Sequence, residues 1–312
     1  MKSSLAESTL YHLAKWMYAR NPGQSTRMTA ALNDTESYDA YRRECVGKVL
    51  DAARNFGVDW TGKDVLDLGC FDGALTRGYA DAGARTVTGV DIDTAAVESA
   101  RRTYGSDAVR FDVCDTTSIP LDNESVDVIF CYDVMEHVAQ PAPVLAECAR
   151  VLRSGGKMLI GTWGWHHPYA PHLWSIMPVP WAHVAFSERT LLRTCRRIYN
   201  SAWYVPNMHD FDENGQRKTD KFNYEEIPRD YLNKFLIQDF EKVFAECPLD
   251  AVVHPQRFST RWAAWTTPLT RIPWLKEFFT AYIWVVLTRD AVVPRTQRRE
   301  FRQPELETTG AV

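Results

Sequence analysis

The chain has 312 residues, of which 45% are hydrophobic, so it can bury a sizeable core in one large domain or in one domain with an insertion. Its 36 basic and 40 acidic residues give a formal net charge of -4, without the basic excess that nucleic-acid binding leaves in a sequence. This balance argues against a nucleic-acid partner, and nothing in the composition suggests disorder.

The seven cysteines form no C-x-x-C pair and lie in apolar stretches, which predicts reduced core side chains and a cytoplasmic protein. No charged-then-apolar signal peptide opens the chain. The most apolar run, 278–287, has roughly half the ~20 residues that a spanning helix needs. We therefore expect no membrane span.

Residues 1–60 are expected to form an N-terminal helical cap. Apolar side chains recur there at helical spacing: Leu5, Leu10, Leu13 and Met17. A second amphipathic stretch runs over 38–56, and Asn21-Pro22-Gly23 separates the two.

From residue 61, short apolar strands alternate with helical segments. The expected strands are 64–68, 86–91, 109–113, 127–132, 157–162, 251–258 and 282–288. The expected helices between them are 74–82, 94–103, 141–152 and 230–246. This alternation is typical of an α/β protein with a doubly wound parallel sheet, built from a core over 61–162 and its C-terminal completion over 229–293. A polar tail over 294–312 is expected to be flexible.

Residues 163–228 interrupt the alternation with clustered Trp, His and Pro, one helix over about 187–199 and a polar loop. An insertion of this length after the carboxyl edge of a strand is more often functional than ornamental, so we expect a substrate lid. Its aromatic side chains can stack on sugars or planar rings, but an ordinary lid core is the favoured interpretation. The acidic side chains of the polar loop are expected to stay solvated: Asp210, Asp212 and Glu213.

The first core strand runs into a tight glycine turn, DLGCFDG at 67–73, the usual place for a nucleotide-like cofactor in such sheets. Asp91 ends the next strand, about twenty residues on, where a carboxylate can accept both ribose hydroxyls. A dinucleotide fingerprint that begins at Gly69 needs glycine at the positions of Phe71 and Ala74. The side chain at 71 would crowd a pyrophosphate, so the turn disfavours a dinucleotide.

Five successive segments resemble the motifs of class I S-adenosylmethionine (SAM) dependent methyltransferases: VLDLGCFDG, GVDID, FDVCDTTSIP, VDVIFCYDVMEHV and RVLRSGGKMLIGT. The resemblance covers 64–162 in the family's order. It implies SAM as cofactor and a Rossmann-like sheet of seven strands, mostly parallel with the last strand antiparallel. SAM has no phosphate, so a bulky Phe71 is harmless, although glycine is commoner there in the family.

The resemblance also implies the cofactor-binding residues. Asp67 and the turn formed by Gly69, Cys70, Phe71 and Gly73 would face the methionine part, and Asp91 would hold the ribose. The adenine would lie between Ile92 and Thr116, with its amino group donating to Asp115 and to the backbone carbonyl of Cys131. In relatives a helix before the first strand closes over SAM, so Tyr41 or Arg42 is expected to touch the cofactor carboxylate.

Histidines near the carboxyl edge of the sheet are the candidate bases. Methyl transfer from a sulfonium is an in-line displacement, and a base is needed only for acceptors such as hydroxyls. His166 or His167, which follow the fifth strand, is the hypothesised general base, and the alternative is that both only hold the lid together.

Asp133, Glu136 and His137 form a second cluster. Their D-x-x-E-H pattern is similar to the metal-binding motif of small-RNA 2′-O-methyltransferases and some quinone O-methyltransferases, where a later histidine completes the site. His166, His167 or His172 would complete a site for a divalent metal here, and His137 is a further catalytic candidate. An E-H pair at this place is also frequent in methyltransferases without metal, so metal use stays open.

We expect an enzyme that methylates a small molecule or biosynthetic intermediate at oxygen, with a sugar or natural-product type acceptor. Oxygen is preferred because a hydroxyl needs deprotonation more than an amine does, and histidines cluster beside the expected methyl group. An NAD-dependent oxidoreductase on a similar sheet and a non-catalytic SAM-binding module are the alternatives. The sequence predicts neither the oligomeric state nor the identity of the acceptor.

Overall fold

The computed structural model describes residues 4–20, 31, 34–115, 117–212, 214–219, 221–258 and 263–290. The chain divides into two compact units, the first made of Met1–Arg42 and Trp165–Leu232, the second of Arg43–Gly164 and Asn233–Val312. The predicted break at Asn21-Pro22-Gly23 and the predicted tail over 294–312 lie outside the described residues.

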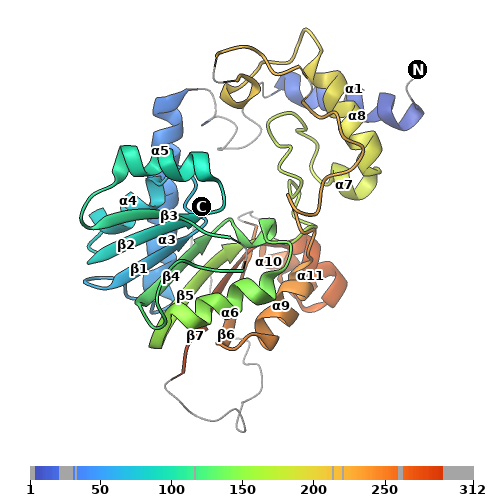
Figure 1. Cartoon of the computed structure of the whole chain (residues 1–312). Helices are drawn as coiled ribbons and strands as arrows, with labels where there is room; N and C mark the ends of the chain where they lie inside the picture. The colour runs from blue at the N-terminus through green and yellow to red at the C-terminus, as the bar shows by residue number, and fades with distance from the viewer. Residues whose placement is uncertain are drawn as a thin grey trace. The chain divides into compact units, whose positions relative to one another are not determined.

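The second unit is built on a sheet that has seven strands among the described residues, in the order β3-β2-β1-β4-β5-β7-β6 (Figure 1). The strands are β1 Asp64–Leu68, β2 Thr86–Asp91, β3 Val109–Val113, β4 Val126–Tyr132, β5 Leu152–Thr162, β6 Asp250–Arg257 and β7 Thr280–Thr288. Strands β1 to β5 pair in parallel, and β7 pairs antiparallel with both β5 and β6. The predicted α/β fold with an antiparallel last strand is therefore confirmed.

Helices cover both faces of this sheet (Figure 1). The helices of this unit are α3 Thr35–Asn55, which begins in the first unit, α4 Ala74–Asp81, α5 Thr94–Tyr104, η1 Met135–His137, α6 Pro141–Val151, α9 Ile237–Glu246, α10 Ala263–Thr266, η3 Thr267–Arg271 and α11 Pro273–Phe279. The larger core lies between the sheet and the apolar faces of α6 and α9, where Leu145 and Phe240 are fully buried. Asp93 fixes the start of α5 by accepting from the backbone N–H groups of Ala95 and Ala96.

The helix predicted over 230–246 begins only at Ile237. The Asn233 side chain instead donates to the carbonyls of Met135 and Val138, at 2.7 and 2.9 Å, which holds the preceding segment out of helical geometry. Lys234 follows with a φ of 60°, a left-handed conformation that a helix does not contain.

The first unit packs α1 Leu5–Arg20 against α8 Glu188–Tyr199, with the short helices α7 Ala182–Ala185 and η2 Met208–Asp210 beside them. The buried stripe of α1 is Leu10, Ala14 and Tyr18, spaced four residues apart. Leu5 and Leu13, which the helical spacing also singled out, are 85% and 39% exposed. The helix was therefore predicted correctly, but part of its apolar stripe was not.

The expectation that Asp210 stays solvated is wrong, because its side chain is fully buried in the first unit. It accepts from the Tyr204 hydroxyl at 2.7 Å and from the Asn207 backbone N–H at 2.9 Å, and it forms an ion pair with Lys221. A buried carboxylate with these partners is satisfied without water. Asp212 is exposed as expected, and Glu213 lies outside the described residues.

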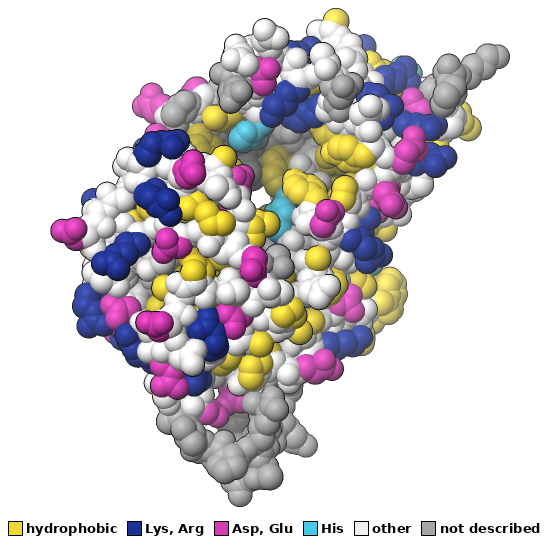
Figure 2. All heavy atoms as spheres, in the orientation of Figure 1, with side chains coloured by type: hydrophobic (Ala, Val, Ile, Leu, Met, Phe, Trp, Pro, Cys, Tyr) yellow, Lys and Arg dark blue, Asp and Glu magenta, His cyan; other side chains and the backbone are white. Residues whose placement is uncertain are grey.

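Among the helices that the structure describes, none has the length and apolar character of a membrane-spanning segment. On the face drawn in Figure 2, Lys and Arg side chains are intermixed with Asp and Glu. This distribution agrees with the nearly balanced charge of the chain.

Candidate active site

The turn after β1 depends on two glycines in the left-handed region, Gly69 with φ of 80° and Gly73 with φ of 79°. Gly69 donates to the Val90 carbonyl at 2.8 Å, so the turn bends across the end of β2. A Cβ at Gly69 would overlap the Val134 side chain, and one at Gly73 would lie 2.8 Å from the Phe111 ring. Neither position therefore accepts another residue without rearrangement.

Phe71 lies between these glycines and is itself in the left-handed region, with φ of 43°. A bulky side chain rarely adopts this conformation, and such strain persists only where the surroundings enforce it. Its backbone N–H donates to Asp91 Oδ2 at 2.8 Å, while its side chain is 47% exposed. The turn therefore presents an aromatic ring to solvent at the carboxyl edge of the sheet.

Two other predicted residues of the turn have buried side chains. Asp67 is 2% exposed, and its Oδ2 accepts from the Thr76 hydroxyl at 2.6 Å, which ties the end of β1 to α4. Cys70 packs with Val97 and Phe111, and burial raises the pKa of its thiol. Cys70 can thus meet a ligand through its backbone only.

Asp91 and Asp115 follow at the ends of the next two strands. Because Leu68 pairs with Val90 and Asp91 pairs with Val113, the glycine turn, Asp91 and Asp115 lie in sequence along one edge of the sheet.

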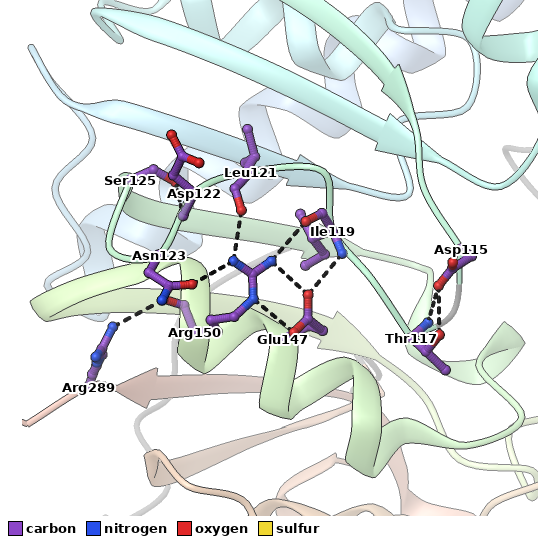
Figure 3. Close-up of polar contacts among 10 residues, drawn as sticks. All are labelled: Asp115, Thr117, Ile119, Leu121, Asp122, Asn123, Ser125, Glu147, Arg150 and Arg289. Carbon is purple, nitrogen blue, oxygen red and sulfur yellow. Dashed lines mark hydrogen bonds and ion pairs between the residues drawn. The ribbon is translucent and has the colours of Figure 1, made fainter.

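Both carboxylates are anchored by local donors. Asp91 accepts from the backbone N–H groups of Phe71 and Asp93, at 2.8 and 3.0 Å. Asp115 accepts from the backbone N–H and the hydroxyl of Thr117 at 2.6 and 2.8 Å (Figure 3), and these bonds lower its pKa. Thr116 lies outside the described residues.

This edge fits the nucleoside of SAM. Fixed carboxylates can accept the hydrogens of ribose hydroxyls and of an adenine amino group. Exposed apolar side chains stand beside them: Phe71, Ile92, which is 64% exposed, and Val113. Apolar side chains at such a place can cover the faces of a purine.

Two carboxyl groups lie at the carboxyl end of β4, and Glu136 is buried while Asp133 is half-buried. Asp133, with φ of 55°, accepts from the Tyr282 hydroxyl at 2.7 Å, and Glu136 accepts from the Thr162 hydroxyl at 2.8 Å. Burial, together with the charge of Asp133, raises the pKa of Glu136 to about 8. Cys131 precedes this cluster within β4, and its side chain is buried in the core.

The remaining predicted residues are divided between the units. His137 ends η1 in the second unit, whereas Tyr41, His166 and His167 belong to the first. Burial, reinforced by the nearby His183, lowers the pKa of His167 to about 4. Burial also lowers the pKa of His166. Neutral imidazoles at pH 7 are therefore expected, and a base with so low a pKa is a weak one.

Residues 66–160 match the methyltransferase domain family. The chain carries a class I SAM-dependent methyltransferase domain. A probable S-adenosylmethionine-dependent methyltransferase of Mycolicibacterium smegmatis is 40% identical over 101 residues, which cover 32% of this chain and 38% of that protein. A ubiquinone biosynthesis O-methyltransferase of Pseudomonas aeruginosa is 33% identical over 130 residues, covering 38% and 56% respectively.

The matched segments thus span less than two thirds of the length of these curated relatives. Among solved structures, a SAM-dependent methyltransferase from Mesorhizobium loti superposes with a TM-score of 0.45 at 15% identity, over 77% of this chain and 96% of that one. The family match coincides with β1 to β5, the strands that carry the glycine turn, Asp91 and Asp115.

Two features of the second unit escaped the sequence analysis. Tyr282 on β7 is hydrogen-bonded to Asp133 although 149 residues separate them, and no local pattern indicates such a pair. Arg150 and Glu147 bind the loop that begins at Asp115 (Figure 3). Their spacing of three residues on α6 was a usable signal, because side chains three apart share one helix face.

Proposed function

We propose that this protein transfers a methyl group from SAM to a hydroxyl oxygen of a small biosynthetic molecule. The observation that carries the proposal is the anchored carboxylate of Asp91, which two backbone N–H groups hold at the strand end next to the glycine turn. A carboxylate fixed there is preorganised to receive ribose hydroxyls.

An NAD-dependent oxidoreductase remains the rival enzyme class, and Phe71 is the argument against it. A dinucleotide needs its pyrophosphate close to the backbone of this turn, where the ring of Phe71 is exposed. A non-catalytic SAM-binding module is the second rival, and only turnover separates it from an enzyme.

Bound SAM supplies an electrophilic methyl group on a sulfonium, open to in-line displacement. In the proposed mechanism the turn at Gly69 and Gly73 holds the methionine part, while Asp91 and Asp115 orient the nucleoside. His137, His166 or His167 would take the proton of an acceptor hydroxyl. The Pseudomonas relative is a ubiquinone biosynthesis O-methyltransferase, which supports oxygen as the acceptor atom.

Calorimetric titration with S-adenosylhomocysteine and, separately, with NAD tests the cofactor. We expect binding of S-adenosylhomocysteine only. Asp91→Asn should weaken it at least tenfold, whereas the matched Asp93→Asn, two residues on, should retain it because asparagine still caps α5. Absence of heat with wild-type protein, or equal affinity in both variants, would refute the assignment.

Methyl transfer itself is tested by incubating the protein with cell extract and SAM labelled on the methyl group. Mass spectrometry of the labelled products then gives the acceptor and the atom methylated. Label found on a protein or nucleic acid, and not on a small molecule, would overturn the acceptor class.

A further inference from the structure

Asp115 lies near the start of the loop between β3 and β4, and one arginine on α6 binds this loop (Figure 3). The Arg150 guanidinium donates to two loop carbonyls, those of Ile119 and Leu121, each at 2.8 Å. It also donates to the side-chain oxygen of Asn123 at 2.9 Å. The same loop is therefore held at three successive odd-numbered positions.

Glu147 completes the arrangement from one turn earlier on α6. Its two oxygens accept from Arg150 at 2.8 and 2.7 Å, and Oε2 also accepts from the backbone N–H of Ile119 at 3.0 Å. These bonds to Arg150 are the main cause of a lowered pKa for Glu147, so the pair stays charged at neutral pH.

All five N–H groups of the guanidinium are used in these contacts. Lysine has three donors on a rotating ammonium and cannot reproduce a planar set of five. If only the positive charge were needed, lysine would serve as well. The use of all five guanidinium donors therefore indicates that Arg150 fixes the conformation of the loop.

The bonds from α6 also affect the position of Asp115, near the start of the loop. Asp115 is joined to Ser118 by a backbone bridge and accepts from Thr117, so its position depends on where the following residue, Ile119, is fixed. Ile119 is buried, and both its N–H and its carbonyl are bonded to the pair on α6. A shift of Ile119 would therefore be transmitted to the Asp115 carboxylate.

We propose that Arg150, together with Glu147, is a positioning residue that sets the affinity and the adenine selectivity of the cofactor site through Asp115. The proposal rests on the proposed function, in which Asp115 accepts from the adenine amino group. It adds two residues on α6, which act through the loop, to those that determine cofactor recognition.

The test compares Arg150→Lys with the control variant Arg153→Lys. Arg153 lies three residues further on and forms ion pairs with Asp64 and Asp127 at the opposite end of the strands. Calorimetry measures the affinity of each variant for S-adenosylhomocysteine and for S-inosylhomocysteine, whose purine carries a carbonyl where adenine has an amino group. We expect Arg150→Lys to bind S-adenosylhomocysteine about tenfold more weakly and to lose most of the preference over the inosine analogue. Arg153→Lys should keep both.

A role in folding alone would change thermal stability and leave the ratio of the two affinities intact. Arg150→Lys with a wild-type ratio would thus overturn the proposal, as would a wild-type protein that binds both ligands equally. If wild-type protein binds neither ligand, the proposed function itself fails. Should Arg150→Lys not fold, Glu147→Gln answers the same question, because it removes one oxygen from the same pair and is expected to lower the same ratio.

Discussion

The backbone N–H of Phe71 donates to the carboxylate of Asp91 at 2.8 Å, and this bond joins a strained residue to the best candidate for ribose binding. The left-handed φ of Phe71 is costly for an aromatic residue, while its ring is half exposed and gains little from burial. The arrangement is understandable if the ring serves a ligand.

Phe71→Asn should therefore stabilise the free protein and weaken cofactor binding. Asparagine tolerates the left-handed region, so we expect relief of roughly 1 kcal/mol, measured by urea unfolding, together with a weaker affinity for S-adenosylhomocysteine. Phe222→Asn is the matched control, because Phe222 also has a positive φ but is buried in the first unit. That control should lose stability, and a Phe71 variant that behaves like it would contradict our interpretation.

Gly69→Ala should destabilise the second unit strongly, because the new Cβ meets the side chain of Val134 as well as an unfavourable φ. Gly155→Ala separates the two effects, since Gly155 has a similar φ of 77° and nothing lies near its Cβ. We expect a loss of about 1 kcal/mol for Gly155→Ala and about 2–4 kcal/mol for Gly69→Ala. Addition of Val134→Ala should restore part of the difference, and no restoration would mean that another contact dominates.

Glu136 should make the stability of the protein fall as the pH rises. Its folded pKa of about 8 exceeds the unfolded value near 4.5, so the folded state is favoured while the carboxyl is protonated. This contribution is complete below about pH 4.5 and is lost progressively up to about pH 8, with a slope of at most about 1.4 kcal/mol per pH unit. Urea unfolding across this range should show the slope in wild type and a flatter profile in Glu136→Gln. Parallel profiles would assign the pH dependence to other groups.

The lowered pKa values of His166 and His167 affect the pH dependence expected if either residue is the base. If His167 is the base, its pKa of about 4 places the acid limb of kcat/KM well below the usual range of histidine. His166→Ala and His167→Ala, measured with saturating SAM, should each lower kcat by about 10²-fold or more if that residue is the base. Full turnover with intact SAM binding would remove the residue from the mechanism.

Metal dependence is tested by exhaustive chelation followed by measurement of methyl transfer. An E-H pair at this place is also frequent in methyltransferases without metal, so we expect methyl transfer to survive chelation. Activity that is lost on chelation and returns with Mg²⁺ would reverse this expectation and favour the D-x-x-E-H cluster as the site.

The sheet could be predicted closely because its strands are short apolar runs separated by helices, and β1, β2 and β3 have the bounds that the sequence indicated. Asp91 and Asp115 end two of those strands, so their common edge follows from the parallel order alone. The helix start at Ile237 could not be predicted in this way. It depends on hydrogen bonds from Asn233 to carbonyls nearly a hundred residues earlier.

The burial of Asp210 could not be predicted from the sequence either, because it depends on contacts that form only in the folded chain. The stretch that follows it, from Asp212, is polar, and only the fold brings Tyr204 and Lys221 to its carboxylate. Acidic residues in a polar stretch are usually solvated, so the sequence pattern favoured the common outcome. The individual roles of the cofactor-binding residues and the histidines stay predictions.

The first unit is assembled from the two sequence segments that flank the sheet-forming residues up to Gly164. Helix α1 buries Leu10, Ala14 and Tyr18 against α8, which begins at Glu188. During synthesis, well over a hundred residues are therefore added after α1 before α8 is made. The first five strands of the sheet are complete by then. Deletion of α1 would leave the apolar side of α8 uncovered, so shortened versions of this chain are expected to aggregate even though the strands and the glycine turn remain.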